Sequence, residues 1–257
     1  MRPDERERYL LHARSAAYHR RLQRANEAIA EALQMSEKPY VSFSGGKDST
    51  VLLDLVRRQK PDIEAAFFDS GAEFPDTIAF IEHLIDDGLD VQWVEPAYNM
   101  LELYEMVGAF SGKKMVRQLA KGEMSRILIK EPAKLLREQG YDLAFIGLRA
   151  QESKFRTKNF GVRGHIYHTA YDDLYHAIPL ATWHPVDIWA YIVSEDIPYN
   201  AVYDKEWPGG REAIRVGAYA GSTDGTLSHG RWAFVKRHYP DVWREFCKKF
   251  PAATRYV

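Results

Sequence analysis

The sequence is poor in cysteine, since Cys247 is the single cysteine among 257 residues. One cysteine cannot form an internal disulfide, and it excludes a CxxC redox pair, a Cys₄ zinc site and an iron–sulfur cluster ligated by this chain alone. Long apolar runs are lacking too, because no stretch approaches the ~20 residues that a membrane-spanning helix needs. The charged start, Met1-Arg2-Pro3-Asp4-Glu5-Arg6, does not fit a signal peptide. We therefore expect a cytoplasmic protein with no membrane contact, no Fe–S cluster and no zinc.

The chain also lacks an excess of charge of either sign, since 35 basic residues oppose 36 acidic ones. The distribution is uneven: residues 1–25 carry seven basic and three acidic side chains, residues 226–257 seven and two, and residues 26–225 carry 21 and 31. Basic ends of this kind either contact an anionic partner such as nucleic acid or are solvated helix faces. Apolar residues make up 46% of the chain, which is ordinary for a globular protein.

Short β-prone segments alternate with helical ones along most of the chain. Apolar spacing over about 5–35 predicts an N-terminal helix. Strands are expected at 40–43, 63–68, 91–94, 143–146 and 177–180, and helices at 50–58, 75–86 and 123–139. This alternation predicts a three-layer α/β/α fold with a mostly parallel five-stranded sheet, whose last strand lies at an edge because it contains Pro179. We expect an N-terminal helix at 1–37, the α/β domain at 38–182 and a helical C-terminal extension at 183–257.

The segment after the first strand has the residues of an anion-binding loop, Ser44-Gly45-Gly46-Lys47-Asp48-Ser49. The two glycines let the backbone approach a ligand closely, and the following helix offers free N–H groups and a positive dipole end. Lys47 adds a charge for a phosphate oxygen. Asp48 suits a Mg²⁺ ion that bridges to phosphates. Ligands of parallel sheets bind beyond the carboxyl ends of strands, so we expect the site just after Phe43, Phe68 and Ile146.

This hexapeptide resembles the PP-loop of the adenine nucleotide α-hydrolase-like superfamily. Four further segments resemble its phosphoadenylyl-sulfate (PAPS) reductase branch. Residues 69–77 (DSGAEFPDT) are similar to D-T-G-x-x-F-P-E-T, and residues 147–156 (GLRAQESKFR) to G-x-R-x-x-x-S-x-x-R. Residues 179–192 resemble P-L-x-x-W…D-V-W-x-Y-I, and residues 197–204 (IPYNAVYD) resemble I-P-Y-N-P-L-Y-D. The five segments occur in the family's order.

The resemblance implies a Rossmann-like PP-loop fold that binds ATP, or PAPS or adenylyl sulfate (APS), with Mg²⁺ held by Asp48. It implies charge-stabilising catalytic roles for Lys47, Asp48, Arg149 and Arg156, because guanidinium and ammonium groups suit phosphate or sulfate oxygens. The implied nucleotide-binding residues are Ser42, Phe43, Ser44, Gly45, Gly46, Lys47, Asp48, Ser49, Thr50, Phe68, Asp69, Ser70, Gly147, Leu148, Arg149 and Ser153.

The sequence departs from the family where the reductases carry their cysteines. The reductases act through a cysteine in a short C-terminal E-C-G-x-H-like tail, whereas Cys247 lies in Phe-Cys-Lys-Lys-Phe, a setting typical of a small buried apolar residue. The alternative is an exposed thiol whose pKa the neighbouring lysines lower. Many relatives also carry a G-C-x-x-C-like element, and here Ala218 and Gly221 take the two cysteine positions.

The leading hypothesis is therefore an enzyme that cleaves ATP between the α- and β-phosphates, adenylates an acceptor and releases pyrophosphate. The first alternative is a PAPS/APS reductase that uses Cys247 or a partner's thiol, and the second is a nucleotide-binding subunit without activity. The acceptor is open, with nucleic acid as one candidate, and we expect a homo-oligomer or a partner protein. The basic segment 113–134 is either a lid over the phosphates or a solvated face. We expect His165 and His168 at the surface, and Trp183, Trp189 and Tyr191 in packing.

Overall fold

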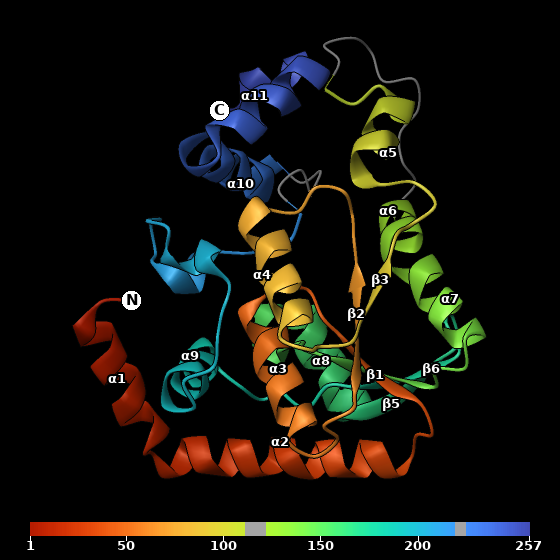
Figure 1. Ribbon diagram of the computed structural model, residues 1–257, viewed down its shortest axis with the longest axis vertical. Helices are drawn as coiled ribbons and strands as arrows, with labels where there is room; N and C mark the ends of the chain where they lie inside the picture. Colours follow the sequence, from red (N-terminus) through yellow and green to blue (C-terminus); the bar gives the residue numbers. More distant parts are fainter. Residues whose placement is uncertain (111–121, 219–224) are drawn as a thin grey trace.

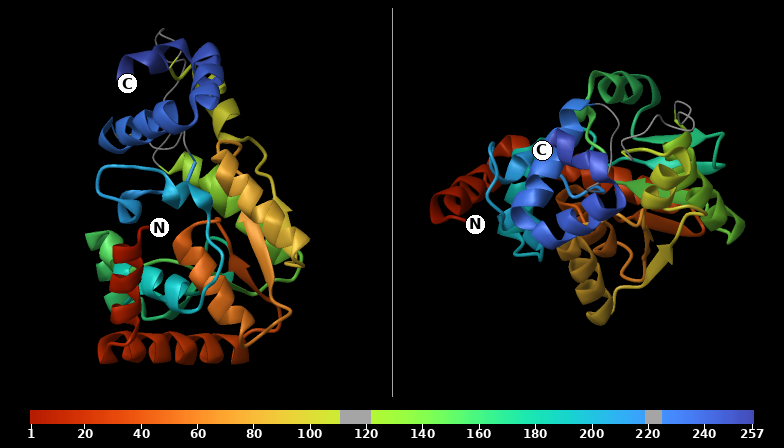
Figure 2. Two further views of the ribbon diagram at one scale, coloured as in Figure 1. Left: turned by 60° about the vertical axis from the view of Figure 1, so that its left-hand side comes forward. Right: turned by 90° about the horizontal axis from the view of Figure 1, so that it is seen from above.

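The chain builds a parallel α/β core with a long helix beneath it and a group of C-terminal helices at the opposite end (Figure 1). The computed structural model describes residues 1–110, 122–218 and 225–257. The first helix stands beside the core and the second runs along its base (Figures 1 and 2). Within these described ranges, no helix combines the length and apolarity that crossing a membrane would require.

The described strands form one six-stranded sheet in the order β3-β2-β1-β4-β6-β5. Neighbours are parallel except β5 and β6, which form an antiparallel hairpin at one edge. Chain order reverses between β1 and β4, so a crevice is expected at the carboxyl ends of these two strands. The strands are β1 (Pro39–Ser42), β2 (Glu64–Phe68), β3 (Val91–Val94), β4 (Leu143–Ile146), β5 (Ile166–Thr169) and β6 (Leu174–Ala177).

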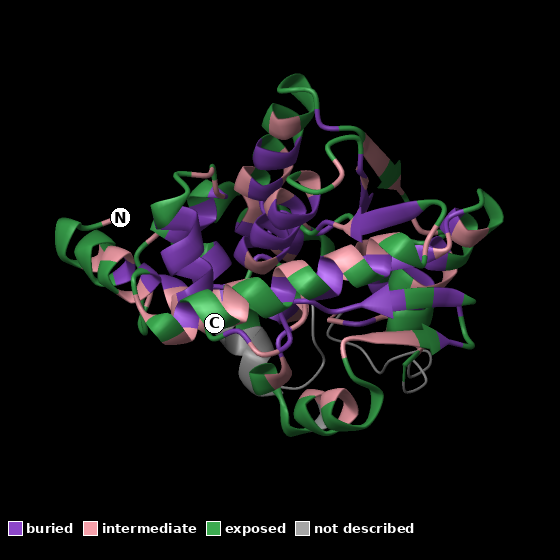
Figure 3. Cartoon of the chain, turned by 90° about the horizontal axis from the view of Figure 1, so that it is seen from below, coloured by how far each residue is buried: buried purple, intermediate pink, exposed green. Residues whose placement is uncertain are grey.

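Helices cover both faces of this sheet, because successive strand residues point to opposite sides. Val41 and Phe145 belong to the core shared with α3 (Lys47–Arg57) and α4 (Pro75–Asp86). Tyr40 and Ala144 belong to a second core, which α7 (Glu131–Glu138) closes with Leu136. Viewed from below, the central strands are buried (Figure 3). The apolar character of both faces is what a parallel sheet between helices requires.

The N-terminal helices are tied to the core by one buried carboxylate. Asp187, in α9 (Pro185–Ser194), is fully buried and bonds Arg21 Nη2 and His12 Nε2, each at 2.7 Å. Its other oxygen accepts from the His184 N–H at 2.7 Å. Arg21 lies in α2 (Ala16–Gln34) and His12 in α1 (Pro3–Ala13). This cluster therefore fixes both N-terminal helices against α9.

The C-terminal helices α10 (Gly225–His238) and α11 (Pro240–Lys249) rest on α5 (Met100–Val107) through aromatic side chains. Phe110, just after α5, contacts Trp232 with ring centroids 4.9 Å apart, and Tyr104 contacts Phe250 at 6.0 Å. The remaining short elements are α6 (Glu123–Ser125), the π-helical η1 (Arg126–Lys130), η2 (Ala150–Glu152), α8 (Lys154–Arg163), η3 (Ala201–Asp204), η4 (Arg211–Ala213) and η5 (Pro251–Tyr256).

The structure confirms the α/β class and corrects the sheet from five strands to six. The predicted last strand, 177–180, is displaced to β6, and Pro179 lies beyond its end. The strand at this edge of the sheet is β5, and it was not predicted because His and Tyr interrupt its apolar pattern. The single N-terminal helix is two helices, because Ser15 begins α2 by accepting the Tyr18 N–H at 3.2 Å. Trp183, Trp189 and Tyr191 are buried, as predicted.

Candidate functional site

A pocket of about 290 Å³ opens at the carboxyl ends of β1 and β4, where chain order reverses. Two of the predicted loops and three segments of the C-terminal part meet there. The lining residues are Ser42, Ser44, Gly46, Lys47, Asp48, Ser49, Ile146, Gly147, Leu148, Tyr203, Arg215, Val216, Gly217 and Arg231. Eight of the residues that the sequence predicts for nucleotide binding thus line one pocket.

Glycine is required at three points of this wall. Gly45 has a positive φ of +66°, and a Cβ there would lie 2.9 Å from Thr77 Cγ2. A Cβ on Gly46 would lie 2.8 Å from Val216 Cγ2. A Cβ on Gly147 would meet backbone atoms at the start of α3, with Ser49 N at 3.0 Å. The loops after β1 and β4 are therefore packed backbone against backbone.

The hydroxyl groups of the loop hold its turn and the first residues of α3. Ser49 Oγ donates to the Gly46 carbonyl at 3.0 Å and accepts the Ser44 N–H at 3.2 Å. Thr50 Oγ1 donates to the same carbonyl at 3.0 Å. Thr50 is buried and does not line the pocket. In this structure Thr50 thus holds the loop in shape, and its contact with a nucleotide stays a prediction.

Lys47 and Asp48 line the pocket and form a mostly buried charge cluster with Arg149, which does not line it. Lys47 Nζ lies 2.8 Å from Asp48 Oδ2, and Arg149 Nε lies 2.5 Å from Asp48 Oδ1. The Lys47 and Arg149 side chains are each 2% exposed. Burial lowers the pKa of Lys47, and Asp48 opposes this by its charge and its hydrogen bond, whereas Arg149 lowers the pKa further. Two buried cations therefore depend on one carboxylate.

Glu152 extends this cluster to Arg156. Its Oε1 accepts from Arg149 Nη2 at 3.1 Å, and its Oε2 is hydrogen-bonded to Arg156 Nη1. Ser153, predicted to bind nucleotide, caps α8 by accepting the Arg156 N–H at 3.1 Å. Arg156 lies on α8 (Lys154–Arg163), and it pairs beside the pocket rather than lining it.

The C-terminal part supplies residues that the site prediction did not contain. Tyr203 is buried, and its hydroxyl accepts the Lys47 N–H at 3.1 Å. Burial raises the pKa of Tyr203, so this hydroxyl stays neutral. Asn200 Nδ2 donates to the Gly45 carbonyl at 3.2 Å. Both residues belong to the IPYNAVYD segment, and that resemblance was the signal that could have placed them; Arg215 and Arg231 carried no such signal.

Four predicted nucleotide-binding residues near the ends of β1 and β2 lie outside the pocket lining. Phe43 is buried against Phe80, and its N–H donates to the Ala66 carbonyl at 2.9 Å. Asp69 accepts from the Gly71 N–H at 2.8 Å and from Trp93 Nε1 at 3.1 Å. Ser70 Oγ donates to Glu73 Oε1 at 2.6 Å. Phe68 is the last residue of β2, the strand next to β1, and Asp69 and Ser70 follow it, so all three stay predicted binding residues at the neighbouring strand end.

Glu73, in the segment after β2, is an acid whose pKa is shifted. Burial is the largest cause that raises its pKa, to about 7, and the neighbouring Asp69 carboxyl is the next. Hydrogen bonds from Ser70 act to lower the pKa. Glu73 therefore holds its proton more tightly in the fold than a solvated glutamate does.

Cys247 lies in α11 and is half-buried. Burial raises the pKa of its thiol, and Lys236 offsets this only in part. A thiol in such a setting is mostly protonated and a poor nucleophile at neutral pH. The structure thus agrees with the buried apolar interpretation of this cysteine and not with the activated one.

Other predicted features have local partners. His165 Nδ1 lies 3.4 Å from the Ile178 carbonyl, and His168 Nε2 lies 3.1 Å from Asp173. Residues 113–121 of the basic segment 113–134 lie outside the described residues. In the described remainder, Arg126 pairs with Glu131, and Lys130 lies 4.5 Å from the centroid of the Tyr171 ring.

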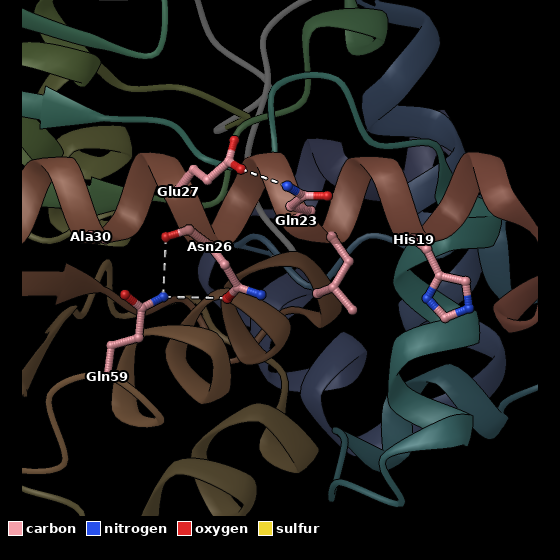
Figure 4. A pocket seen from close by; sticks show the side chains of 7 residues that line it. His19, Gln23, Asn26, Glu27, Ala30 and Gln59 are labelled. Carbon is pink, nitrogen blue, oxygen red and sulfur yellow. Dashed lines mark hydrogen bonds between the residues drawn. The ribbon is translucent and has the colours of Figure 1, made fainter.

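A larger hollow of about 590 Å³ lies along α2 and is a weaker candidate (Figure 4). Its polar groups are satisfied by one another: Gln59 Nε2 donates to the Asn26 carbonyl at 3.2 Å, and Gln23 Nε2 donates to Glu27 at 2.8 Å. Figure 4 shows the side chains spread along the helix rather than converging on one point. The hollow therefore lacks the convergent charges of the pocket at β1 and β4.

Comparison with known proteins agrees with the motifs. The sequence model of the phosphoadenosine phosphosulfate reductase domain matches residues 38–223. The adenosine 5′-phosphosulfate reductase of Geobacillus kaustophilus is 30% identical over 196 residues, 74% of this chain and 77% of that protein. An uncharacterized protein of Methanocaldococcus jannaschii is 27% identical over 228 residues, and the match covers 85% of this chain but 42% of that longer relative.

Solved structures show the same fold at low identity. The phosphoadenylyl-sulfate reductase from Candida auris, a phosphate complex, superposes with a TM-score of 0.56 at 18% identity, covering 77% of this chain and 90% of that one. The FMN adenylyltransferase of Candida glabrata in complex with ATP gives 0.51 at 20% identity, covering 78% and 64%. At these identities the comparison speaks for the fold alone.

Proposed function

The chain belongs to the phosphoadenosine phosphosulfate reductase domain family, and from that premise we propose that it binds ATP in the pocket at β1 and β4 and transfers the adenylyl group to an acceptor. The observation that supports this most is the convergence of Lys47 and Arg149 on one carboxylate at the N-terminus of α3. Buried cations at the N-terminus of a helix suit a polyanion, and the phosphates of a nucleotide are one.

In the proposed reaction, an acceptor oxygen or nitrogen attacks the α-phosphorus of ATP. The new bond joins acceptor and phosphorus, and the bond between the α-phosphorus and the bridging oxygen breaks. Pyrophosphate leaves with that oxygen and its electron pair. Lys47 and Arg149 stabilise the charge that develops on the phosphate oxygens, which is the main contribution proteins make to phosphoryl transfer.

Asp48 suits a magnesium ion that accompanies the nucleotide. The described residues contain no group of three His, Cys, Asp or Glu side chains arranged to hold a metal by themselves. Mg²⁺ commonly binds through one or two carboxylates together with substrate phosphates and water. Asp48, 17% exposed in the pocket wall, fits that arrangement, and the ion would neutralise charge on the phosphates.

The test is product analysis with ATP, APS and PAPS, each with and without Mg²⁺. The proposal expects pyrophosphate from ATP in the presence of an acceptor, and no sulfite from APS or PAPS. Arg149→Lys removes the guanidinium fork and should lower turnover, whereas Lys158→Ala, on an exposed helix position outside the pocket lining, should not. Binding of ATP without product would favour a nucleotide-binding subunit, and absence of ATP binding would overturn the proposal.

A sulfonucleotide reductase is the second candidate, because the relative from Geobacillus kaustophilus carries that name. Reduction to sulfite needs a thiol as the electron donor. The family match ends at residue 223, before Cys247, and burial raises the pKa of that thiol. A reductase built on this chain would thus take its thiol from a partner protein. Sulfite release that requires an added dithiol protein would identify this case.

A further inference from the structure

The three predicted cations of the site are already compensated by carboxylates. Asp48 bridges Lys47 and Arg149, and Glu152 bridges Arg149 and Arg156. Charges therefore alternate along a chain of five side chains. An incoming anion must compete with these two carboxylates for every cation in the chain.

Arg215 lines the same pocket and stands outside that chain. Its Nη1 donates to the backbone carbonyls of Glu212 at 3.0 Å and Ile214 at 3.4 Å. Among the described residues, no carboxylate lies within ion-pair distance of Arg215. Its charge nevertheless acts on the site, because it lowers the pKa of Lys47 and of Arg156. Arg215 is thus a pocket cation with no acidic partner.

The segment that carries Arg215 is braced on both sides. Glu212 accepts a hydrogen bond from Tyr9 Oη in α1 at 3.2 Å. Arg211 is buried, pairs with Asp204 at 3.2 Å and lies 5.0 Å from the centroid of the Trp189 ring. These contacts hold the backbone on which the Arg215 side chain is mounted.

The next residue, Val216, packs this segment against the loop at residues 44–49. Val216 packs so closely on Gly46 that a Cβ at Gly46 would lie 2.8 Å from Val216 Cγ2. Arg215 is therefore presented beside the N-terminus of α3, and the pocket it lines does not include Phe68 or Asp69, which are predicted nucleotide-binding residues at the end of β2.

We propose that Arg215 is a specificity-determining residue that binds the outer phosphates of a nucleoside triphosphate. This inference rests on the proposed function and deepens it by assigning a preference for triphosphate over monophosphate. Because Arg215 Nη1 donates to two backbone carbonyls, the guanidinium has a fixed orientation before the ligand binds. Its remaining N–H groups are left to donate to phosphate oxygens. It also needs no displacement of a carboxylate, unlike Lys47 and Arg149.

The test measures binding of ATP and AMP by calorimetry to the natural protein, Arg215→Gln, Arg215→Lys and Arg163→Gln. Arg163 is the matched control, because it is exposed at the end of α8 and does not line the pocket. We expect Arg215→Gln to weaken ATP binding about tenfold, the lower end for a charge-assisted hydrogen bond because Arg215 is exposed. AMP binding should stay within about twofold, and Arg215→Lys should restore part of the loss.

Inorganic triphosphate serves as a second probe, since it should show the same loss without any nucleoside. Equal losses for ATP and AMP, unchanged ATP binding, or the same loss in Arg163→Gln would overturn the proposal. A loss confined to PAPS relative to APS would overturn it as well, because it would place the 3′-phosphate at Arg215. If the natural protein binds ATP with this Arg215 dependence but releases no pyrophosphate, the adenylation proposal fails while the role of Arg215 stands.

Discussion

Replacing Asp48 by asparagine should destabilise the protein, because two buried cations would lose their shared carboxylate. Lys47 and Arg149 are each 2% exposed and lie 2.8 and 2.5 Å from Asp48 oxygens. Removing one partner of a buried ion pair typically costs about 3–5 kcal/mol. Asp48 keeps 17% exposure and Arg149 keeps Glu152, so we expect the lower end, about 3 kcal/mol.

The same substitution should strengthen binding of a phosphate-like anion. Asp48 occupies the cations that an anion would use, and its removal takes away a competing negative charge. An anion at 100 times its Kd stabilises a protein by about 2.7 kcal/mol, so pyrophosphate should return most of the lost stability. The benefit at a given pyrophosphate concentration should be larger in Asp48→Asn than in the natural protein. The Mg²⁺-dependent part of ATP affinity should decrease, since the carboxylate proposed for the ion is gone.

Urea unfolding followed by tryptophan fluorescence, with and without pyrophosphate, measures both effects. Asp62→Asn is the control, because Asp62 pairs with Lys60 at 2.9 Å on the exposed surface and should leave the urea midpoint unchanged. A loss below about 1 kcal/mol in Asp48→Asn would refute the claim that Lys47 and Arg149 depend on this carboxylate. Equal stabilisation of both proteins by pyrophosphate would refute its role as a competing anion.

Three further outcomes follow from the geometry. Gly147→Ala should lower the free energy of unfolding by about 1–3 kcal/mol and weaken ATP binding, because its Cβ would press on the backbone at 3.0 Å. The control Gly161→Ala, with open space around it, should be neutral or slightly stabilising, and urea midpoints and ATP titration measure both variants. Cys247→Ser should leave pyrophosphate release unchanged, and loss of a thiol-dependent sulfite signal would instead favour the reductase. The pKa of Glu73 is raised to about 7 in the folded state, so its protonation stabilises the fold below pH ~4.3, and this stability is lost as pH rises toward 7. The difference in urea midpoint between Glu73→Gln and the natural protein should therefore change across that range, and a constant difference would contradict the raised pKa.

The central part of the fold followed from sequence because its signals are local. β1 and β4 are short apolar runs next to turn residues, and a strand, a glycine pair and a helix in succession leave few alternatives. The hairpin β5–β6 did not follow, because Tyr167 and His168 give it no apolar alternation. Polar side chains hold the hairpin together, because Asp172 in its turn contacts His176 of β6 at 2.9 Å and accepts from Thr169 of β5, a pattern that apolar periodicity does not detect.

The candidate site was predictable where one segment supplies both loop and charge, as at Lys47 and Asp48. It was not predictable where the contributing residue is distant in sequence. Glu152 appeared in a segment chosen for its arginines, yet it pairs with two of them. Arg215 lies 168 positions beyond Lys47 and reaches the pocket only because η4 is anchored to α1 and α9. Such a contribution depends on chain folding and has no local pattern.

The scarcity of cysteine acquires a structural meaning from this arrangement. The residues that line the pocket hold charge, hydroxyl groups and close-packed glycines, and none of them is a cysteine. The cations are kept in place by Asp48 and Glu152, so the anion site needs no thiol and no cluster for its shape. Cys247 lies outside the pocket lining, so its substitution should leave the shape of the pocket unchanged. Under the proposed function, nucleotide binding and pyrophosphate release need no thiol of this chain, and substitution of Cys247 tests that proposal directly.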